Sequence, residues 1–341
     1  MIKMKKNRLL IAPVFIPHEG CPYRCVFCSQ IDITGIAFQA DEENVLGTLK
    51  TYIEPSLKSN KFSRREVAFY GGSFTGLPDE RQELLLSLIK PLIHDGRVDA
   101  IRISTHPLFV DRKQLDRLKV SCVETVELGI QSTDPEVLEQ SGRPCSRADM
   151  LSAVSLIREY DFKLGLQLML GLPGDSKKRF EKSVADVIGM KPDFVRLYPA
   201  LVLKHTPLYT MYEQGLYVPW SLERTLDALK TAVKLFGHAG IPVIRIGLQP
   251  DNSLRDNYIA GPFHPSLRYL VDCRIGLDLM VDKISSLDII PERVLFRVPM
   301  NSVSIYTGNK RENLLLLKER FGLKDIKLSG EEHCHQLELV A

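Results

Sequence analysis

Three cysteines lie close together near the start of the sequence, at Cys21, Cys25 and Cys28. Their C-x3-C-x2-C spacing comes just after the apolar run Leu9–Ile16, which we expect to form a first β-strand. Three thiolates can hold three corners of a cubane iron–sulfur cluster, and the spacing supplies no fourth cysteine. The remaining iron would then be open to a ligand from outside the protein. An open iron is a catalytic feature.

Zinc and a disulfide are the competing interpretations of these cysteines. A structural zinc site has four closed ligands, often two C-x2-C pairs or a cysteine pair with two distant histidines, and no second pair is found here. A disulfide would leave one of the three thiols over. No signal peptide directs the chain to an oxidising compartment. Both alternatives stay open at this point, and the cluster is the interpretation we favour.

The composition is that of a globular protein with a sizeable core. Of the 341 residues, 44% are hydrophobic and 26% are charged, which fits one barrel-sized domain and an appendix. No apolar stretch reaches the roughly 18–20 residues that span a bilayer, so we expect a cytoplasmic protein without a membrane partner. The net charge of +3 neither requires nor excludes a polyanionic partner.

Apolar runs and helical stretches alternate along the first 200 residues. Strands are expected at 9–16, 67–70, 100–105, 125–130, 163–170 and 194–198, with helices between them. This alternation predicts an α/β fold with a parallel sheet, namely a partial (β/α)6 barrel of the TIM type whose loops gather at the carboxyl ends of the strands.

The alternation weakens beyond residue 240. We therefore predict two domains, a partial barrel over 1–240 and a small α+β C-terminal extension over 241–341. The apolar run at 241–247 is interpreted as a strand that begins the second module. Within the extension, strands are expected at 294–298, 302–306, 325–328 and 336–340, and a helix at 310–321.

Four further motifs accompany the cysteines, and together they resemble a known family. They are YGGSFTG (70–76), ELGIQSTDPEVLEQSGR (127–143), RLYPALVLKHTPLYTMYEQGLY (196–217) and, more distantly, GPFHPSLR (261–268). Together with the segment from Cys21 to Cys28, they resemble the radical S-adenosylmethionine (SAM) superfamily, and within it the Elongator catalytic subunit and its bacterial stand-alone relatives. The likeness spans about residues 8 to 240.

This resemblance implies the cofactors and the reaction. Cys21, Cys25 and Cys28 would be the ligands of a [4Fe-4S] cluster, and SAM would occupy the open iron. The cluster would pass one electron to SAM and cleave it reductively, giving a 5′-deoxyadenosyl radical. A one-electron reductant of the flavodoxin or ferredoxin type is therefore an expected partner.

The SAM-binding residues are predicted from the same motifs. Gly71 and Gly72 would expose backbone groups to the methionyl end of SAM, and the backbone of Phe27 would contact adenine. The amides of Gln131 and Gln167 suit ribose hydroxyls; alternatively, they satisfy buried backbone groups. At the position of Gln167 the coproporphyrinogen oxidases, which are related, carry an aspartate.

Arg143 could form a bidentate contact with the methionine carboxylate, or it could be an exposed arginine in a turn.

The substrate is less determined than the cofactors. The Elongator subunit continues into an acetyltransferase domain, for which this sequence offers no motif, so its complete reaction is not carried over. RNA, including tRNA, is one candidate substrate, and a tetrapyrrole or a peptide is another. A metal-stabilised RNA-binding or regulatory protein is the non-enzymatic alternative. Candidate phosphate contacts are Lys3, Lys5, Lys6, Arg8, Lys177, Lys178, Arg179 and Lys182.

A few other residues have chemistry-bearing side chains without a supporting pattern. His264 lies between two prolines, and either a structural or a substrate-facing role is open. Cys145 lies near Arg143 and could be an acceptor, whereas the sequence His333–His335 is interpreted as an exposed strand edge rather than a metal site.

Overall fold

A single parallel sheet of seven strands dominates the N-terminal part of the computed structural model, which describes residues 8–29, 41–59 and 61–340. The strand order is β1-β2-β3-β4-β5-β6-β8, and every neighbouring pair is parallel. The strands are β1 (Leu9–Ile16), β2 (Arg64–Gly71), β3 (Ala100–Thr105), β4 (Val123–Gln131), β5 (Lys163–Leu170), β6 (Phe194–Pro199) and β8 (Val243–Ile246).

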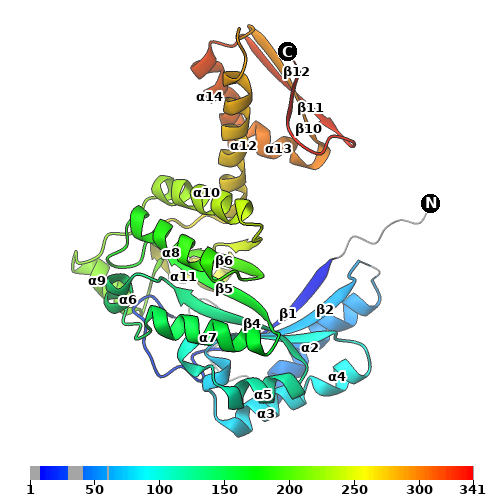
Figure 1. Cartoon of the computed structure of the whole chain (residues 1–341), viewed down its shortest axis with the longest axis vertical. Helices are drawn as coiled ribbons and strands as arrows, with labels where there is room; N and C mark the ends of the chain where they lie inside the picture. Colours follow the sequence, from blue (N-terminus) through cyan, green and yellow to red (C-terminus); the bar gives the residue numbers. More distant parts are fainter. Residues whose placement is uncertain (1–7, 30–40, 60, 341) are drawn as a thin grey trace. The chain divides into compact units, whose positions relative to one another are not determined.

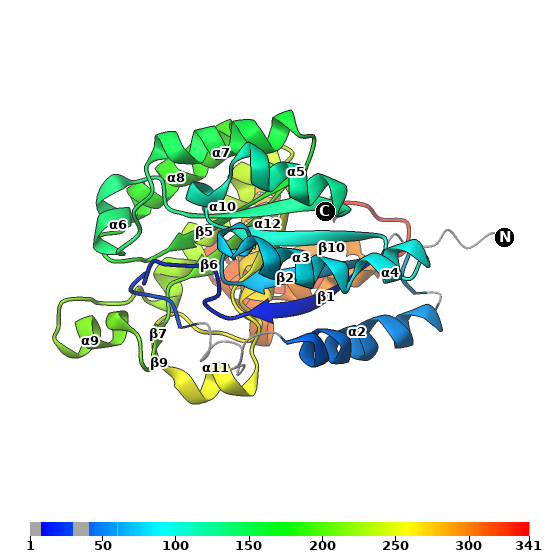
Figure 2. The same cartoon turned by 90° about the horizontal axis from the view of Figure 1, so that it is seen from below.

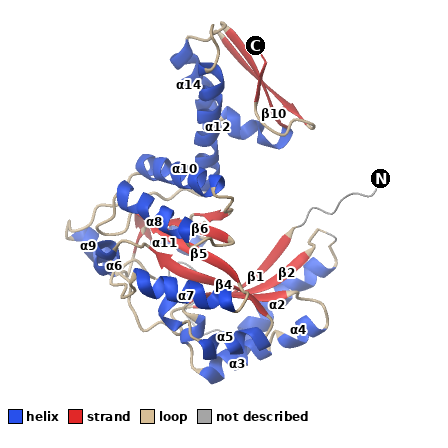
Figure 3. Ribbon diagram, in the orientation of Figure 1, coloured by secondary structure: helices blue, strands red, loops and turns tan. Residues whose placement is uncertain are grey.

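The sheet curls into a half-barrel with helices along its convex side (Figures 1 and 3). Seen from below, α5, α7 and α8 follow one another along one side of the sheet (Figure 2). The helices that connect its strands are α2 (Glu42–Leu57), α3 (Asp79–Ser87), α4 (Lys90–His94), α5 (Arg112–Val120), α6 (Pro135–Gln140), α7 (Arg147–Glu159), α8 (Lys177–Gly189) and α9 (Pro207–Glu213). This arrangement confirms the predicted partial barrel, including all six of the expected strands.

The seventh strand corrects the expectation for residues 241–247. The sequence pattern predicts that this run starts a separate module, but Val243 pairs with Val195 and Ile246 with Leu197, so β8 extends the barrel sheet. Helix α10 (Leu222–His238) precedes this strand. It therefore belongs to a further strand–helix–strand connection of the kind that builds the rest of the sheet.

The chain divides by packing into two compact units. The first contains residues 1–220 and 235–262, and the second contains 221–234 and 263–341. These divisions differ from the predicted domain boundary between residues 240 and 241. That boundary stays a prediction. In the first unit, α11 (Asn252–Asn257) is followed by β9 (Tyr258–Ala260), which pairs antiparallel with β7 (Val202–Leu203).

The second unit is a small α+β fold with its own core. Strands β10 (Arg293–Pro299), β11 (Asp325–Glu331) and β12 (Glu338–Val340) form a sheet in the order β11-β10-β12. Besides the part of α10 within residues 221–234, its helices include α12 (Leu267–Ser285), α13 (Val303–Thr307) and α14 (Glu312–Phe321). The predicted strand at 302–306 is wrong, because this segment forms α13. Helical spacing brings Val303 and Tyr306 to the same core cluster as Phe296.

No helix among the described residues combines the length and the apolar character that crossing a membrane requires.

Candidate active site at the carboxyl ends of the strands

The loop that follows β1, residues 17–29, carries the three cysteines and is called the cysteine loop. It is fixed against the turn that follows β2. Gly72 N donates to Ile16 O at 2.9 Å, and Ser73 N donates to Glu19 O at 2.9 Å. A Cβ on Gly72 would lie 1.9 Å from Glu19 O, and a Cβ on Gly76 would lie 2.1 Å from Gly20 O. Only glycine permits this approach of two backbones.

These contacts give Gly72 a role that the sequence did not predict. The space left by its missing side chain is filled by the backbone of the cysteine loop. Gly71, next to it, ends β2 with a φ of 100°, a backbone conformation that favours glycine. Contacts of either residue with SAM stay a prediction.

The three cysteines differ in exposure. Cys25 is buried, whereas Cys21 and Cys28 are half-buried, and none of the three is in a disulfide. A turn in which Cys28 N donates to Cys25 O at 3.0 Å links the last two, and the Cys21 thiol donates to Tyr23 O at 3.5 Å. Burial raises the pKa of the Cys21 thiol, against the opposing effect of the Tyr23 hydrogen bond.

The middle of the loop is held from two sides. Val26 N donates to Ser141 O at 3.0 Å, and Leu208 N donates to Val26 O at 2.9 Å. The segment after α6 and the first turn of α9 therefore fix the backbone between Cys25 and Cys28. Phe27 packs against a small apolar cluster that contains Val137, Leu172 and Ala200.

The three cysteines are not arranged around a single metal ion. Among residues 8–29, 41–59 and 61–340, no three Cys, His, Asp or Glu side chains converge to hold a single ion. A tetrahedral zinc site needs that convergence. A cubane cluster distributes its thiolates over different irons, so three thiols spaced along one fixed loop fit a cluster better.

Arg143 lies beside the cysteine loop and is buried, not exposed. Its side chain reaches back to the loop: Nη1 donates to Cys25 Sγ at 3.5 Å, and Nη2 donates to Gly129 O. Only 7% of Arg143 is exposed, so the interpretation as an exposed turn arginine is wrong. The Nε atom has no hydrogen-bond partner among the described residues.

Gln131 lies next to this arginine at a bulge in β4. The register of β4 against β5 shifts between Gly129 and Gln131, and Gln131 has a φ of 66°. A Cβ on Gly129 would contact Gln131 Nε2 at 2.8 Å and Arg143 Nη2 at 3.3 Å, so the two side chains adjoin this glycine. Gln131 Oε1 is buried without a hydrogen-bond partner in the described part of the chain.

Gln167 lies elsewhere, in the interior of the barrel. Its Nε2 donates to Glu127 Oε2 at 3.1 Å and to Ser104 Oγ at 3.5 Å. The amide is therefore part of a polar network between strands. This resembles the alternative role for Gln167, in which its amide satisfies buried polar groups. A ribose contact of Gln167 stays a prediction.

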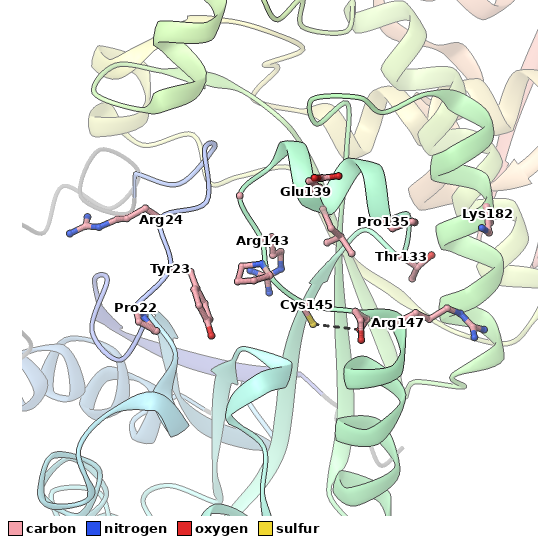
Figure 4. A pocket seen from close by; sticks show the side chains of 14 residues that line it. Pro22, Tyr23, Arg24, Thr133, Pro135, Glu139, Arg143, Cys145, Arg147 and Lys182 are labelled. Carbon is pink, nitrogen blue, oxygen red and sulfur yellow. Dashed lines mark hydrogen bonds between the residues drawn. The ribbon is translucent and has the colours of Figure 1, made fainter.

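A cleft of about 910 Å³ opens between the cysteine loop and the segment that carries Arg143 (Figure 4). Residues 22–24 of the loop form one wall, and Arg143 and Cys145 belong to the other. Burial raises the pKa of the Cys145 thiol to about 11, so this thiol is protonated near neutral pH. A protonated thiol is a poor nucleophile, so Cys145 is not activated to accept an acyl group.

Comparison with known protein families decides the identity of this site. A model of the radical SAM superfamily matches residues 15–187, just over half of the chain, and the match contains the cysteine loop. The chain belongs to the radical SAM superfamily. A model of the radical SAM C-terminal domain matches residues 192–276.

Individual relatives place the chain near the Elongator-like radical SAM proteins. A tRNA uridine(34) acetyltransferase of Methanocaldococcus jannaschii is 31% identical over 259 residues, or 65% of this chain and 48% of that protein. The heme chaperone HemW of Bacillus subtilis is 24% identical, over 58% of this chain and 53% of HemW. The chain thus spans about half the length of these curated relatives.

A solved structure has the same fold. An archaeal Elp3 from Methanocaldococcus infernus, with an N-terminal deletion, superposes with a TM-score of 0.63 at 21% sequence identity. The superposition covers 81% of this chain and 63% of that chain. This structure shows the shared fold, and the family models with the sequence match to the tRNA uridine(34) acetyltransferase confirm the predicted resemblance to the Elongator catalytic subunit.

Membership in the radical SAM superfamily fixes the cofactors and the class of protein. Superfamily members use a [4Fe-4S] cluster and SAM, so the chain is an enzyme that uses both.

The radical SAM barrel also contains a charged network that the sequence analysis missed. Glu127, fully buried, accepts from Arg102 Nη1 at 2.9 Å, from Tyr70 Oη at 3.1 Å and from Arg196 Nη2 at 3.1 Å. Burial and the charge of Glu127 raise the pKa of Tyr70, which keeps the phenol protonated. Charged residues inside otherwise apolar strands were the sequence signal that could have revealed this network.

A second residue that the sequence analysis missed is His106, which directly follows β3. It is 4% exposed, its Nδ1 accepts from Leu108 N at 3.2 Å, and its ring lies 5.4 Å from that of Tyr23 in the cysteine loop. Burial, with the charge of Arg143, lowers its pKa to about 3. The imidazole is therefore neutral, and its Nε2 has no hydrogen-bond partner among the residues described.

Two of the remaining singled-out residues lie in the second unit. His264 Nδ1 accepts from Ser266 N at 3.1 Å, as expected of a histidine that stabilises a turn. The thiol of Cys334 donates to Gln336 O at 2.8 Å, and it is buried. Lys3, Lys5 and Lys6, at the start of the chain, lie outside the described residues.

Proposed function

We propose that this radical SAM enzyme holds its [4Fe-4S] cluster through Cys21, Cys25 and Cys28 and cleaves SAM reductively at the carboxyl ends of the barrel strands. The observation that carries the proposal is the fixation of one loop with three thiols against the Gly72 turn. A side chain at that glycine would collide with the loop, so the position of the loop depends on glycine at this point of the chain.

Unpartnered polar atoms support a ligand beside the loop. Arg143 Nε and Gln131 Oε1 are buried without hydrogen-bond partners in the described part of the chain, and buried polar groups rarely remain so in a complete site. SAM carries an amino group, a carboxylate and ribose hydroxyls that match such atoms. We assign to SAM the backbones of Phe27, Gly71 and Gly72 and the side chains of Gln131, Arg143 and Gln167.

The cluster, when bound, supplies one electron to the sulfonium of SAM, which releases methionine and a 5′-deoxyadenosyl radical. The residues of this chain orient SAM and exclude water from the strand ends. The electron requires an external one-electron donor, for which we propose a flavodoxin or a ferredoxin.

Anaerobic reconstitution with iron and sulfide tests this assignment. The wild-type chain, given dithionite and SAM, should form 5′-deoxyadenosine and methionine, and Cys25→Ala should form neither. Cys122→Ala is the matched control, because Cys122 is exposed and far along the sequence from the loop. A wild-type protein that takes up zinc and no cluster under these conditions would refute the proposal.

For the substrate we propose RNA, and tRNA in particular. The support is twofold: the relative from Methanocaldococcus jannaschii is named for uridine 34 of tRNA, and α8 presents basic side chains. Lys178 and Lys182 are exposed, four residues apart on one face of the helix, and neither has an ion-pair partner among the described residues. Arg179 is engaged by Gly174 O and Glu136 and is not available to RNA.

A tetrapyrrole is the second candidate, favoured by the similarity to a heme chaperone. Comparing 5′-deoxyadenosine formation with tRNA and with tetrapyrroles separates the two. Stimulation by tRNA alone supports our proposal, and stimulation by a tetrapyrrole alone overturns it. Tight tRNA binding that does not stimulate 5′-deoxyadenosine formation would show that RNA is bound but is not the substrate.

A further inference from the structure

The bulge at the end of β4 exposes a backbone carbonyl next to the cysteine loop. Gly129 pairs with Gln167 and Gln131 pairs with Leu168, so the ladder passes over Ile130. The left-handed conformation of Gln131, with a φ of 66°, turns the chain at this point. The carbonyl of Gly129 then accepts a hydrogen bond from the side chain of Arg143.

Arg143 is fixed by this carbonyl and by its own backbone. Nη2 donates to Gly129 O, and Arg143 N donates to Leu138 O at 2.9 Å after the left-handed Gly142. The guanidinium is planar, so fixing one arm also fixes the direction of the other. That second arm, Nη1, points to Cys25 Sγ at 3.5 Å. Arg143 and Cys25 are both nearly inaccessible, at 7% and 5% exposure.

We propose that Arg143 is a positioning residue for the cluster, and that its N–H bond to the Cys25 thiolate makes the cluster easier to reduce. The inference rests on the proposed function, in which Cys25 is a cluster ligand. Reduction adds negative charge to a cluster and its thiolates. A positive N–H donor next to a ligand sulfur stabilises the reduced state more than the oxidised state, and burial strengthens the effect.

This role differs from the carboxylate contact predicted for the same arginine. The contact with Cys25 uses Nη1 and the contact with β4 uses Nη2. The N–H of Nε has no partner among the described residues and can donate to a ligand. A residue that acts only on the carboxylate of SAM has no effect on the cluster when SAM is absent. Measurements without SAM therefore isolate the proposed role.

The test is a redox titration of the full-length, anaerobically reconstituted protein without SAM, followed by electron paramagnetic resonance. Arg143→Gln should shift the midpoint potential to a more negative value at unchanged iron content. Gly129→Ala should shift it in the same direction by a smaller amount, since the new Cβ would lie 3.3 Å from Nη2. Arg147→Gln is the matched control, because this exposed arginine pairs with Asp186.

The control should keep the wild-type midpoint potential. An Arg143→Gln protein that holds a complete cluster at the wild-type potential would overturn the inference.

A second measurement covers the case in which the variant does not take up a cluster. The wild-type chain is labelled with 15N-arginine, and the reduced cluster is studied by pulsed electron paramagnetic resonance. A coupling to 15N that disappears in Arg143→Lys supports the inference. A reduced wild-type cluster without 15N coupling overturns it, and a wild-type chain that forms no cluster at all is instead a failure of the proposed function.

Discussion

Arg102 Nη1 donates a hydrogen bond of 2.9 Å to Glu127 Oε1 in the interior of the half-barrel, where both side chains are buried. The same carboxylate pairs with Arg196, and Arg102 also pairs with Glu66. Burial alone would raise the pKa of Glu66, but hydrogen bonds from Arg64 and the charge of Arg102 lower it. Charged side chains of opposite sign from β2, β3, β4 and β6 are therefore linked inside the barrel.

Glu127→Ala should strongly destabilise the protein. The substitution leaves Arg196 buried without its carboxylate, and breaking a buried ion pair in this way costs about 3–5 kcal/mol of the free energy of unfolding. Urea denaturation followed by circular dichroism measures the change. The exposed pair of Arg112 and Glu159 is the control. Glu159→Ala should leave the denaturation midpoint almost unchanged, and equal losses in both variants would contradict the role of burial.

Gly72→Ala should abolish cluster uptake. Its Cβ would lie 1.9 Å from Glu19 O, and because the colliding atoms are backbone, the cysteine loop must move. Iron content per chain after anaerobic reconstitution is the measurement. Gly47→Ala is the matched control, because this glycine lies inside α2 and a Cβ there would have no atom within 4 Å. That variant should keep its iron and gain up to about 1 kcal/mol in stability. Iron uptake by Gly72→Ala at the wild-type level would refute the argument.

Strand and helix positions in the barrel were predictable because its periodicity is strong and local. Long apolar runs mark the six expected strands, and the capping box formed by Ser146 and Asp149 marks the start of α7. The wrong predictions of secondary structure fall where a local sequence pattern is compatible with two structures. A proline usually ends a helix, yet α2 continues through Pro55 to Leu57. The segment around Val303 is too short for its periodicity to separate a strand from a helix.

The site was predictable in its residue types and less so in their contacts. The cysteine spacing and the glycine turn indicated the loop, because both are contiguous in sequence. The contact of Arg143 with Cys25 joins residues 118 apart and depends on a bulge in β4, which no sequence pattern showed. The same holds for His106, whose burial against Tyr23 follows from the fold and not from its neighbours in the chain.

His106 should make the stability of the protein depend on pH below neutrality. Its pKa is about 3 in the folded protein and close to 6.5 when unfolded, so between these values the unfolded chain binds more protons. The free energy of unfolding therefore falls as the pH decreases from about 6.5 towards 3. The contribution of one such group is at most about 1.4 kcal/mol per pH unit.

His106→Asn should flatten this dependence, since an asparagine can still accept from Leu108 N but does not titrate. The measurement is urea denaturation at several pH values between about 4 and 7, comparing slopes rather than absolute stabilities. His94→Asn replaces an exposed histidine and should leave the slope unchanged. A wild-type slope in His106→Asn would show that other groups cause the pH dependence.

The double variant Lys178→Ala/Lys182→Ala should weaken tRNA binding and reduce its dependence on salt. Each phosphate contact releases counterions, so each lost contact should reduce the slope of log K against log salt by roughly 0.7–0.9. Both lysines lie on one face of α8, so the double variant removes up to two contacts. Lys90→Ala in α4 is the control, because Lys90 is also exposed and basic. If the double variant and the control have the same slope as the wild type, α8 is not the surface that binds RNA.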